Sequence, residues 1–441
     1  MEFLVLLIFV LGYIAITLEH NLKIDKLVPA LGMMALAWAV IALSHLPVFE
    51  INEHGLEATS LESILLHHFG KTCEILIFLI GAMTIVEIID HFDGFSTIKK
   101  FVKTNKKKSL LWIVSILAFI LSAIIDNLTA TIVLITIITK LIEKREERIW
   151  YVGMIIITAN AGGAWSPIGD VTTTMLWMSG KVTTFKLMEH LVLPSLVCMA
   201  VPTFIASFLK PFQGTFEAPA DNGVPSNKHS STMLYLGLGL IVAVPVFKTL
   251  THLPPYIGMM LSLAIFTVFA EVFSNREFNL SNATDINSAH SPAHGALSRI
   301  EMPSLLFFLG ILMTVAALES LGMIFHFGQA VDASIGTDLF VILLGFASAI
   351  VDNVPLVAAG IGMFPNMVAD HPDWHLIAFT AGTGGSMLII GSAAGVVAMG
   401  MEKIDFFWYL KNIAWLALVG YVAGVAAFYF FNHFLFDALS L

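Results

Sequence analysis

The chain has 441 residues, of which 57% are hydrophobic and only 12% are charged, and its mean hydropathy is +0.87. This composition excludes an ordinary soluble enzyme and predicts a polytopic membrane protein with little chain left for a soluble domain. The formal charge of −10 identifies no partner, because the distribution of Lys and Arg across the loops carries the information in a membrane protein.

In the first half, six apolar segments are predicted to enter the membrane, and a polar linker follows them. The segments are residues 3–18, 27–45, 74–93, 109–141, 150–178 and 187–209, and the linker is residues 211–231. The first segment lacks a basic start and an Ala-x-Ala cleavage site, so we expect a retained helix rather than a signal peptide. Cys73 and Cys198 lie in or beside apolar segments, which argues against a disulfide framework and a thiolate metal site.

The second half repeats this pattern, and its polar loop lies at about residues 275–300. Its apolar segments are residues 232–248, 255–274, 302–325, 338–366, 374–400 and 405–436. Because the six units of one half match the six units of the other, we infer a gene duplication. The two halves are residues 1–210 and 232–441.

Two short motifs occur once in each half. Ser-Ala-Ile-Ile-Asp-Asn at residues 122–127 returns as Ser-Ala-Ile-Val-Asp-Asn at residues 348–353, 226 positions later. Thr-Ala-Asn-Ala-Gly-Gly at residues 158–163 corresponds to Thr-Ala-Gly-Thr-Gly-Gly at residues 380–385, 222 positions later. A carboxylate at the bilayer centre costs about 2.5 kcal/mol or more, so two repeated carboxylates predict ion handling.

The fourth unit of the first half, residues 109–141, determines the predicted topology. Its apolar run would form a helix ~45 Å long, whereas the hydrocarbon core is ~30 Å thick. Basic clusters lie on both of its sides, so a re-entrant hairpin with its tip at Asp126 and Asn127 leaves both clusters in the cytoplasm. The alternative is twelve full spans, which places one basic cluster outside.

The corresponding unit of the second half, residues 338–366, lies in a stretch without Lys or Arg, as expected of an extracytoplasmic hairpin. Each half would then contain about five spans, one hairpin and one broken helix, and the two repeats would have inverted topology. This all-α arrangement predicts that the linker is cytoplasmic and that both termini are extracytoplasmic.

The fifth unit of each half contains Gly and Pro residues that predict a broken helix, at about residues 150–178 and 374–400. Main-chain carbonyls and helix ends released at such breaks can ligate a cation or an anion opposite the hairpin tips, and a sodium ion needs about five or six oxygens. Aligning Gly169 with Gly391 places Asp170 opposite Ser392, so the first half carries the extra carboxylate. Two carboxylates that share a small site titrate as a pair and exchange protons for a cation.

Each candidate also has a purely structural interpretation. Asp126 and Asp352 could cap the hairpin tips by accepting hydrogen bonds from backbone amides, and Asp170 could cap the helix break. Threonines in these segments often donate to carbonyls of the preceding turn, and this is the favoured interpretation for any one of Thr129, Thr131, Thr172, Thr173 and Thr174.

These residues resemble those of NhaD-type sodium/proton antiporters, a branch of a superfamily that also contains arsenite permeases and di- and tricarboxylate transporters. The resemblance spans nearly the whole chain. Its most specific parts are residues 122–135 and 158–179, with weaker support from residues 348–360 and 380–400. The resemblance implies inverted repeats with opposed hairpins, a homodimer, an elevator-like movement, and exchange of cytoplasmic sodium or lithium for external protons.

Carried over by this resemblance, the ion-binding candidates lie at the two tips and the two breaks. They are Asp126, Asn127, Thr129, Asn160, Ser166, Asp170, Thr173, Asp352, Asn353, Ser386 and Ser392. The expected sodium ligands among them are Asp126, Asn127, Asp170, Asp352 and Asn353. Carboxylate carriers of the superfamily have a Ser-Asn-Thr pattern at both tips, whereas here both tips begin with Asp-Asn, and no basic residue is expected in the site to pair with an anion.

The sequence therefore predicts a secondary antiporter of the bacterial inner membrane that exchanges sodium or lithium for protons and contributes to pH homeostasis. We expect no enzyme activity, no cofactor beyond the transported ions, and no nucleic-acid partner. The alternatives are a permease for a neutral solute such as arsenite and a sodium-coupled carboxylate symporter. An aspartyl intramembrane protease and a structural scaffold are the alternatives from other classes.

Overall fold

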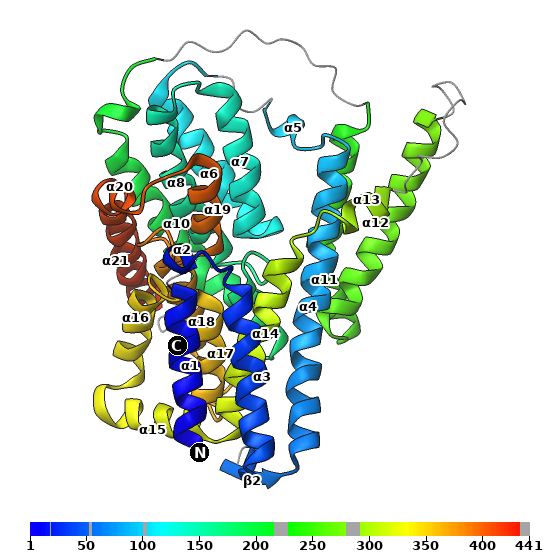
Figure 1. Ribbon diagram of the computed structural model, residues 1–441. Coiled ribbons are helices and arrows are strands. Elements are labelled where there is room, and N and C mark those ends of the chain that lie inside the picture. Colours follow the sequence, from blue (N-terminus) through cyan, green and yellow to red (C-terminus); the bar gives the residue numbers. More distant parts are fainter. Residues whose placement is uncertain (18, 53–54, 100–103, 216–227, 279–291, 433–441) are drawn as a thin grey trace, which may run out of the picture.

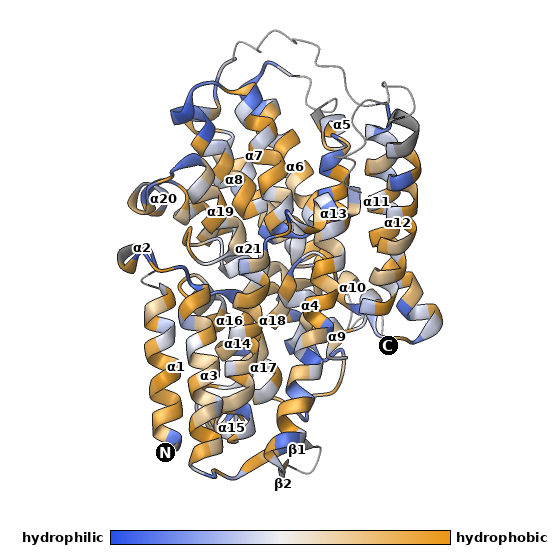
Figure 2. Ribbon diagram, turned by 45° about the vertical axis from the view of Figure 1, so that its right-hand side comes forward, coloured by the Kyte–Doolittle hydropathy of each residue, from blue (hydrophilic) through white to orange (hydrophobic). Residues whose placement is uncertain are grey.

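The computed structural model describes residues 1–441 except 18, 53–54, 100–103, 216–227, 279–291 and 433–441 (Figure 1). The central part of the predicted linker, most of the second polar loop and the end of the last apolar segment lie outside the described residues. The described chain is predominantly helical, as predicted, and Figure 2 shows long hydrophobic stretches along helices such as α3, α7 and α12.

The helices of the first half follow the predicted segments closely. They are α1 (Glu2–Thr17), α2 (Glu19–Leu22), α3 (Leu27–Leu43), α4 (Leu61–His91), α5 (Ser96–Lys99), α6 (Lys107–Ile125), α7 (Asn127–Leu141), α8 (Arg145–Gly163), α9 (Val171–Met178) and α10 (Thr184–Ala206). A short 3₁₀-helix, η1 (Lys210–Phe212), ends this half.

The second half has the same succession of long helices and interrupted helices. Its helices are α11 (Ser230–Thr251), α12 (Pro255–Phe278), α13 (Pro292–Leu297), α14 (Met302–Ser320), α15 (Met323–Ile335), α16 (Thr337–Ser348), α17 (Asn353–Met363), α18 (Pro372–Gly384), α19 (Ala393–Glu402), α20 (Phe406–Asn412) and α21 (Ala414–Phe431). Among the described residues, seven helices are long and apolar enough to cross a membrane, or eight if α15 and α16 form one bent span.

Three features of the fold were not predicted. A two-stranded antiparallel sheet, β1 (Val48–Asn52) and β2 (Gly55–Thr59), departs from a purely helical chain. Helix α4 begins well before the predicted segment and contains 31 residues, which makes it about 46 Å long. Helix α15 forms a separate element that meets α16 at 114°.

The chain reverses its direction at the junction of α6 and α7. Nζ of Lys107, at the start of α6, lies 2.6 Å from Oε2 of Glu147 at the start of α8. Helix α7 ends at Leu141, only a short loop before α8 begins at Arg145. The two ends of the α6–α7 pair therefore meet at the same end of the molecule, and the two helices pack against each other.

The α16–α17 pair also returns to its starting end. The ring of Phe340, near the start of α16, lies 6.3 Å from the ring of Phe364, directly after α17. In Figure 1 this pair lies in the lower part of the molecule, whereas α6 and α7 lie in the upper part.

The two halves pack through corresponding elements. Helix α7 of the first half packs on α19 of the second, and α17 of the second half packs on α9 of the first. In the same way α3 packs on α14 and α4 packs on α12, while α10 and α21 pack on each other. One large apolar core runs through these contacts, and a smaller one lies among α1, α3, α4 and α14.

Glycines allow the helices that carry the site to approach closely, and they do so at matching positions in the two halves. A Cβ on Gly162 of α8 would lie 2.2 Å from the carbonyl oxygen of Phe119 in α6. A Cβ on Gly384 of α18 would lie 2.1 Å from the carbonyl oxygen of Gly345 in α16. Because only glycine fits at such distances, each interrupted helix packs backbone to backbone against the first arm of its own helix pair.

Candidate functional site

Asp126 is the single residue between α6 and α7, and its backbone is unusual for an aspartate. Its φ is 77° and its ψ is 160°, a combination that costs residues other than glycine about 1–3 kcal/mol. Oδ1 of Asp126 accepts a hydrogen bond of 2.8 Å from the Thr129 amide, and Oδ2 accepts one of 2.9 Å from the Thr129 hydroxyl. The structural interpretation as a tip cap is therefore correct, but it does not exclude ion binding, because strain of this kind gathers at functional sites.

Asn127 and Asn160 begin a buried polar network that crosses from the first half to the second. Nδ2 of Asn127 donates to Oδ1 of Asn160 at 3.0 Å. Nδ2 of Asn160 donates to Oγ of Ser386 and to Oγ of Ser392, each at 3.0 Å. All four side chains are at most 4% exposed, so these hydrogen bonds replace the water that the polar groups would otherwise need.

Asp170 lies directly before α9, at the end of the stretch 164–170 that separates α8 from α9. Its Oδ2 accepts hydrogen bonds from the Thr172 hydroxyl at 2.7 Å and from Nδ2 of Asn353 at 2.9 Å. The side chain of Asp170 is buried, with the residue only 3% exposed. The tip of the second half thus reaches the break of the first half, and a buried carboxylate is surrounded by neutral donors.

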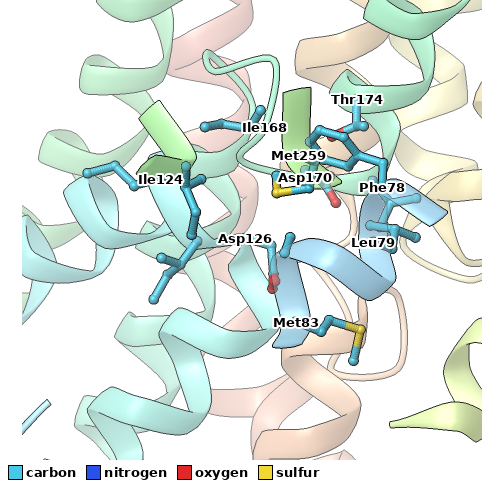
Figure 3. A pocket seen from close by; sticks show the side chains of 13 residues that line it. Phe78, Leu79, Met83, Ile124, Asp126, Ile168, Asp170, Thr174 and Met259 are labelled. Atoms are coloured by element: carbon cyan, nitrogen blue, oxygen red, sulfur yellow. The ribbon is translucent and has the colours of Figure 1, made fainter. Parts of the chain in front are cut away.

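Asp126 and Asp170 line one small cavity (Figure 3). Its volume is about 20 Å³, enough for one water molecule or an ion of similar size. Thr174 contributes a hydroxyl, and the remaining lining residues are apolar and come from helices that include α4, α11 and α12. Two carboxylates in a small and otherwise apolar space repel each other when both are charged, so the space favours either a cation or a proton.

Asp352, the carboxylate of the second tip, has a different environment. Nζ of Lys26, at the start of α3, lies 3.9 Å from Oδ2 of Asp352, and both side chains are largely buried. The Lys26 ammonium also lies 4.4 Å from the ring centre of Phe307. The expectation that no basic residue reaches the site is therefore wrong, because Lys26 is far from the tip in sequence and approaches it only through the packing of the helices.

The structure brings most of the predicted site residues together. Asn127, Asn160, Ser386 and Ser392 are linked by hydrogen bonds, and Asn353 joins Asp170. Ser166 is buried but its hydroxyl accepts a bond of 3.4 Å from the amide of Ile168 in its own loop. Thr173 donates to the main-chain carbonyl of Asp170, as in the structural interpretation of the threonines.

Two contributors were missed by the sequence interpretation, and two threonines were assigned the wrong partner, since the Thr129 hydroxyl donates to the Asp126 carboxylate. Thr172 donates to the Asp170 carboxylate rather than to a carbonyl of the preceding turn. Lys26 pairs with Asp352, and Gly382 lies where an added Cβ would be 3.4 Å from Oδ2 of Asp170. The Gly382 position could have been found by aligning Thr158-Ala159-Asn160 with Thr380-Ala381-Gly382, whereas nothing in the sequence indicates the position of Lys26.

Comparison with known proteins places this chain in a transporter family. A family model described as a citrate transporter, CitMHS, matches residues 13–382. The chain is 43% identical to "Sodium/proton antiporter 1" of Arabidopsis thaliana over 96% of its own length and 71% of that protein. It is also 31% identical to "Na(+)/H(+) antiporter NhaD" of Vibrio cholerae over 97% of its own length and 91% of that protein.

The chain belongs to the NhaD-type antiporters of the citrate transporter family. A second NhaD, from Alkalimonas amylolytica, is 31% identical over 98% of this chain and 91% of its own length. Membership in this family makes the chain an integral membrane transporter and not an enzyme. It confirms the resemblance that the hairpin-tip and helix-break motifs indicated.

Proposed function

We propose that this protein exchanges sodium or lithium ions for protons across the membrane. The observation that carries the proposal is the shared cavity of Asp126 and Asp170, which joins two carboxylates in a space of about 20 Å³. A sodium ion and protons both reduce the negative charge of the pair, so the two cargoes compete for one place. Relatives that are named as sodium/proton antiporters support the same exchange for this chain.

Competition alone gives coupled exchange if the unoccupied site cannot move. An ionised pair that crosses a region of low dielectric without a counter-ion is strongly disfavoured, whereas the neutralised pair is not. The sodium ligands predicted from the sequence are Asp126, Asn127, Asp170, Asp352 and Asn353, and the predicted site also includes Thr129, Ser166, Thr173, Ser386 and Ser392. The proposal gives Asp126 and Asp170 the leading roles, because both line the cavity.

The packing supports two inverted repeats with opposed re-entrant hairpins. The α6–α7 and α16–α17 pairs each return to their starting end, and they occupy opposite parts of the molecule in Figure 1. In the repeat, α7 corresponds to α17 and α9 corresponds to α19. The α7–α19 contact therefore has a symmetric counterpart in the α17–α9 contact, as an internal two-fold axis requires. With 19 residues α6 is long enough to cross a membrane by itself, so its reversal at Asp126, and not its length, supports the hairpin.

An elevator-type movement fits the way the helices group. Helices α1, α3, α4, α11, α12 and α14 pack among themselves, and the hairpins and broken helices pack among themselves. The contacts between the groups do not follow the internal symmetry. Helix α14 packs on α17 and α11 on α6, while the matching pairs α4–α7 and α1–α16 make weaker contact or none among the described residues. Such asymmetry is expected of a carrier caught facing one side.

We further propose that the basic residues near the start of α6 and the end of α7 face the cytoplasm, following the positive-inside tendency. The α1 start and the sheet lie at the opposite, lower end in Figure 1, so the N-terminus would be extracytoplasmic. An extracytoplasmic C-terminus is proposed from the odd number of spans in each half. A homodimer and a location in a bacterial inner membrane complete the proposal, and both rest on the NhaD resemblance.

A proton-flux assay in reconstituted vesicles tests the exchange. Sodium, lithium and potassium are supplied in turn to the wild type and to the Asp126→Asn and Asp170→Asn variants. We expect sodium or lithium to release protons from wild-type vesicles and both variants to be inactive at normal expression. Asp405→Asn is the matched control, because Asp405 is exposed, caps α20 through the Trp408 amide, and Asn caps equally well. Normal sodium-driven proton release from Asp126→Asn would refute the assignment.

A carboxylate symporter is the second candidate, because the matching family model is described as a citrate transporter. Lys26 is a basic residue at the second tip that could attract an anion. The cavity between two aspartates disfavours anionic cargo, so the exchanger remains our proposal. Uptake of labelled citrate driven by sodium, without sodium-dependent proton release, would support the symporter instead.

A further inference from the structure

The internal repeat allows a comparison of the two places where a cation could bind. In the first half, the pair Asn160 and Asp170 flanks the helix break. The corresponding residues of the second half are Gly382 and Ser392. The amide side chain of Asn160 is thus replaced in the second half by the hydrogen atom of Gly382. The carboxylate of Asp170 is replaced by the hydroxyl of Ser392.

Asn160 fills the break of the second half with its own donor group. Both of its amide hydrogens are used by hydroxyl oxygens of that half, those of Ser386 and Ser392, at 3.0 Å each. Ser392 accepts a further hydrogen bond of 3.2 Å from the amide of Gly395. The positive end of the Asn160 amide thus points at the oxygens that would otherwise ligate a cation, and a buried donor cannot be exchanged for a cation without losing both bonds.

Lys26 occupies the second tip in a similar way, by placing a positive group beside the oxygens that would otherwise ligate a cation. Its ammonium lies 3.9 Å from Oδ2 of Asp352, and the exposed fractions of the two side chains are 19% and 13%. A largely buried ammonium neutralises the carboxylate at the second tip and repels a sodium ion at that position. In the second half, Asn160 therefore donates to the oxygens of the helix break, and Lys26 pairs with the carboxylate of the tip.

The first half has the opposite character. Gly382 of the second half faces Asp170, and an added Cβ there would be 3.4 Å from Oδ2 of Asp170 and 3.6 Å from Cβ of Ala164. A glycine at this point leaves space beside the carboxylate where the symmetric position of the other half holds the Asn160 side chain. The space and both cavity carboxylates thus belong to the first half-site.

We infer that each protomer binds its transported cation at one half-site only, beside Asp126 and Asp170, and that Asn160 and Lys26 permanently fill the symmetric half-site. This inference rests on the proposed exchange and specifies its cation stoichiometry. Gly382 is then a residue that keeps the working half-site open, and Asn160 is a positioning residue that closes the other.

Equilibrium binding of radioactive sodium to the purified protein in nanodiscs tests the stoichiometry. We expect close to one sodium ion per protomer at saturation, and sodium-driven proton release with a Hill coefficient near one. Two ions per protomer in an exchanging protein would overturn the inference and leave the exchange itself intact. Absence of any sodium-driven proton movement would instead contradict the proposed function, so the two failures are distinguishable.

Gly382→Ala tests the open half-site without a steric conflict, because its methyl contacts are of ordinary van der Waals length. The variant should raise the sodium concentration for half-maximal exchange by about tenfold or more, since the added methyl group lies beside Oδ2 of Asp170 and restricts the approach of an ion to that oxygen. The control is Gly400→Ala in α19, where an added Cβ meets nothing within 4 Å. Both changes favour helix formation, so a change in KM confined to Gly382→Ala reports on the site and not on folding. Equal KM values in the two variants contradict the inference.

Lys26→Gln tests the filled half-site. Removal of the ammonium should leave Asp352 free to attract cations, which should raise sodium binding above one ion per protomer and raise the pH at which exchange begins, because protons are then held more tightly as well. Lys26→Arg keeps the charge and should behave as the wild type. If Lys26→Gln and Lys26→Arg show the same sodium stoichiometry and pH profile, Lys26 does not fill the second half-site, and this part of the inference is wrong.

Discussion

Asn353 and Asp170 are 183 positions apart in the sequence, yet Nδ2 of Asn353 donates to Oδ2 of Asp170 at 2.9 Å. This bond joins the tip of the second half to the break of the first. A charge-assisted hydrogen bond in a buried site contributes about 1.5–3 kcal/mol. In the proposed exchange, the second half would therefore take part in ion binding by orienting the carboxylate of the first.

Asn353→Ala should raise the sodium KM of exchange by about tenfold or more, because Asp170 loses a donor that fixes its position. Sodium-dependent proton release from vesicles measures the effect. Asn412→Ala is the matched control, since its side chain donates to the carbonyl of Trp408 within α20 and does not touch the site. An Asn353→Ala variant with wild-type KM would show that the bond does not position the carboxylate.

The dependence of exchange on pH should show competition between the two cargoes. As the pH falls, a larger fraction of the carboxylate pair carries a proton, so the apparent sodium KM should rise, by up to about tenfold per pH unit for one competing proton. Saturating sodium should restore the rate over the same range. Initial rates measured at several sodium concentrations and pH values test this, and a sodium KM that does not change with pH would exclude competition.

Gly384→Ala should destabilise the protein strongly, because the new Cβ would collide with the backbone carbonyl of Gly345 and force α16 and α18 apart. Overpacking of this kind costs about 1–3 kcal/mol or more. Gly162→Ala, its counterpart in the first half, should behave alike, while Gly400→Ala should be neutral or slightly stabilising. Thermal unfolding of the detergent-solubilised variants measures their relative stabilities. Equal stability of Gly384→Ala and Gly400→Ala would contradict the close helix packing.

A buried ion pair connects α8 with the end of α19. Nε of Arg148 lies 2.7 Å from Oε1 of Glu402, and Glu402 is only 5% exposed. Arg148→Met should therefore cost about 3–5 kcal/mol, because it leaves a buried carboxylate without its counter-ion. Adding Glu402→Gln to that variant should recover much of the stability, as thermal unfolding would show. A double variant no more stable than Arg148→Met would indicate that the loss comes from packing alone.

Periodicity and hydropathy predicted the fold well where single helices must be long and apolar. The break at Asp126 and the interruption before Asp170 were predicted, because Gly and Pro residues and buried carboxylates mark them directly in the sequence. The sheet of residues 48–52 and 55–59 and helix α15 were not predicted, because these elements are short and carry neither a long apolar run nor a repeated motif.

The candidate site was predictable as a set of residues but not as a set of bonds. Repetition of Asp-Asn identified Asp126 and Asp352 as equivalent, yet the structure gives them different partners. Lys26 reaches Asp352 only because α3 packs on α14, which brings the start of α3 to the second tip. Contacts of this kind depend on tertiary packing, and a single sequence contains no local signal for them.

The backbone of Asp126 has a consequence for how this protein tolerates mutation. Folding alone would favour glycine at a position with this φ and ψ, since glycine alone adopts them without strain. Under the proposed function, a glycine variant would therefore lose transport while it relieves the strain of the backbone. Selection for expression or heat resistance alone would accept such a variant, and only selection for growth under salt or alkaline stress would reject it.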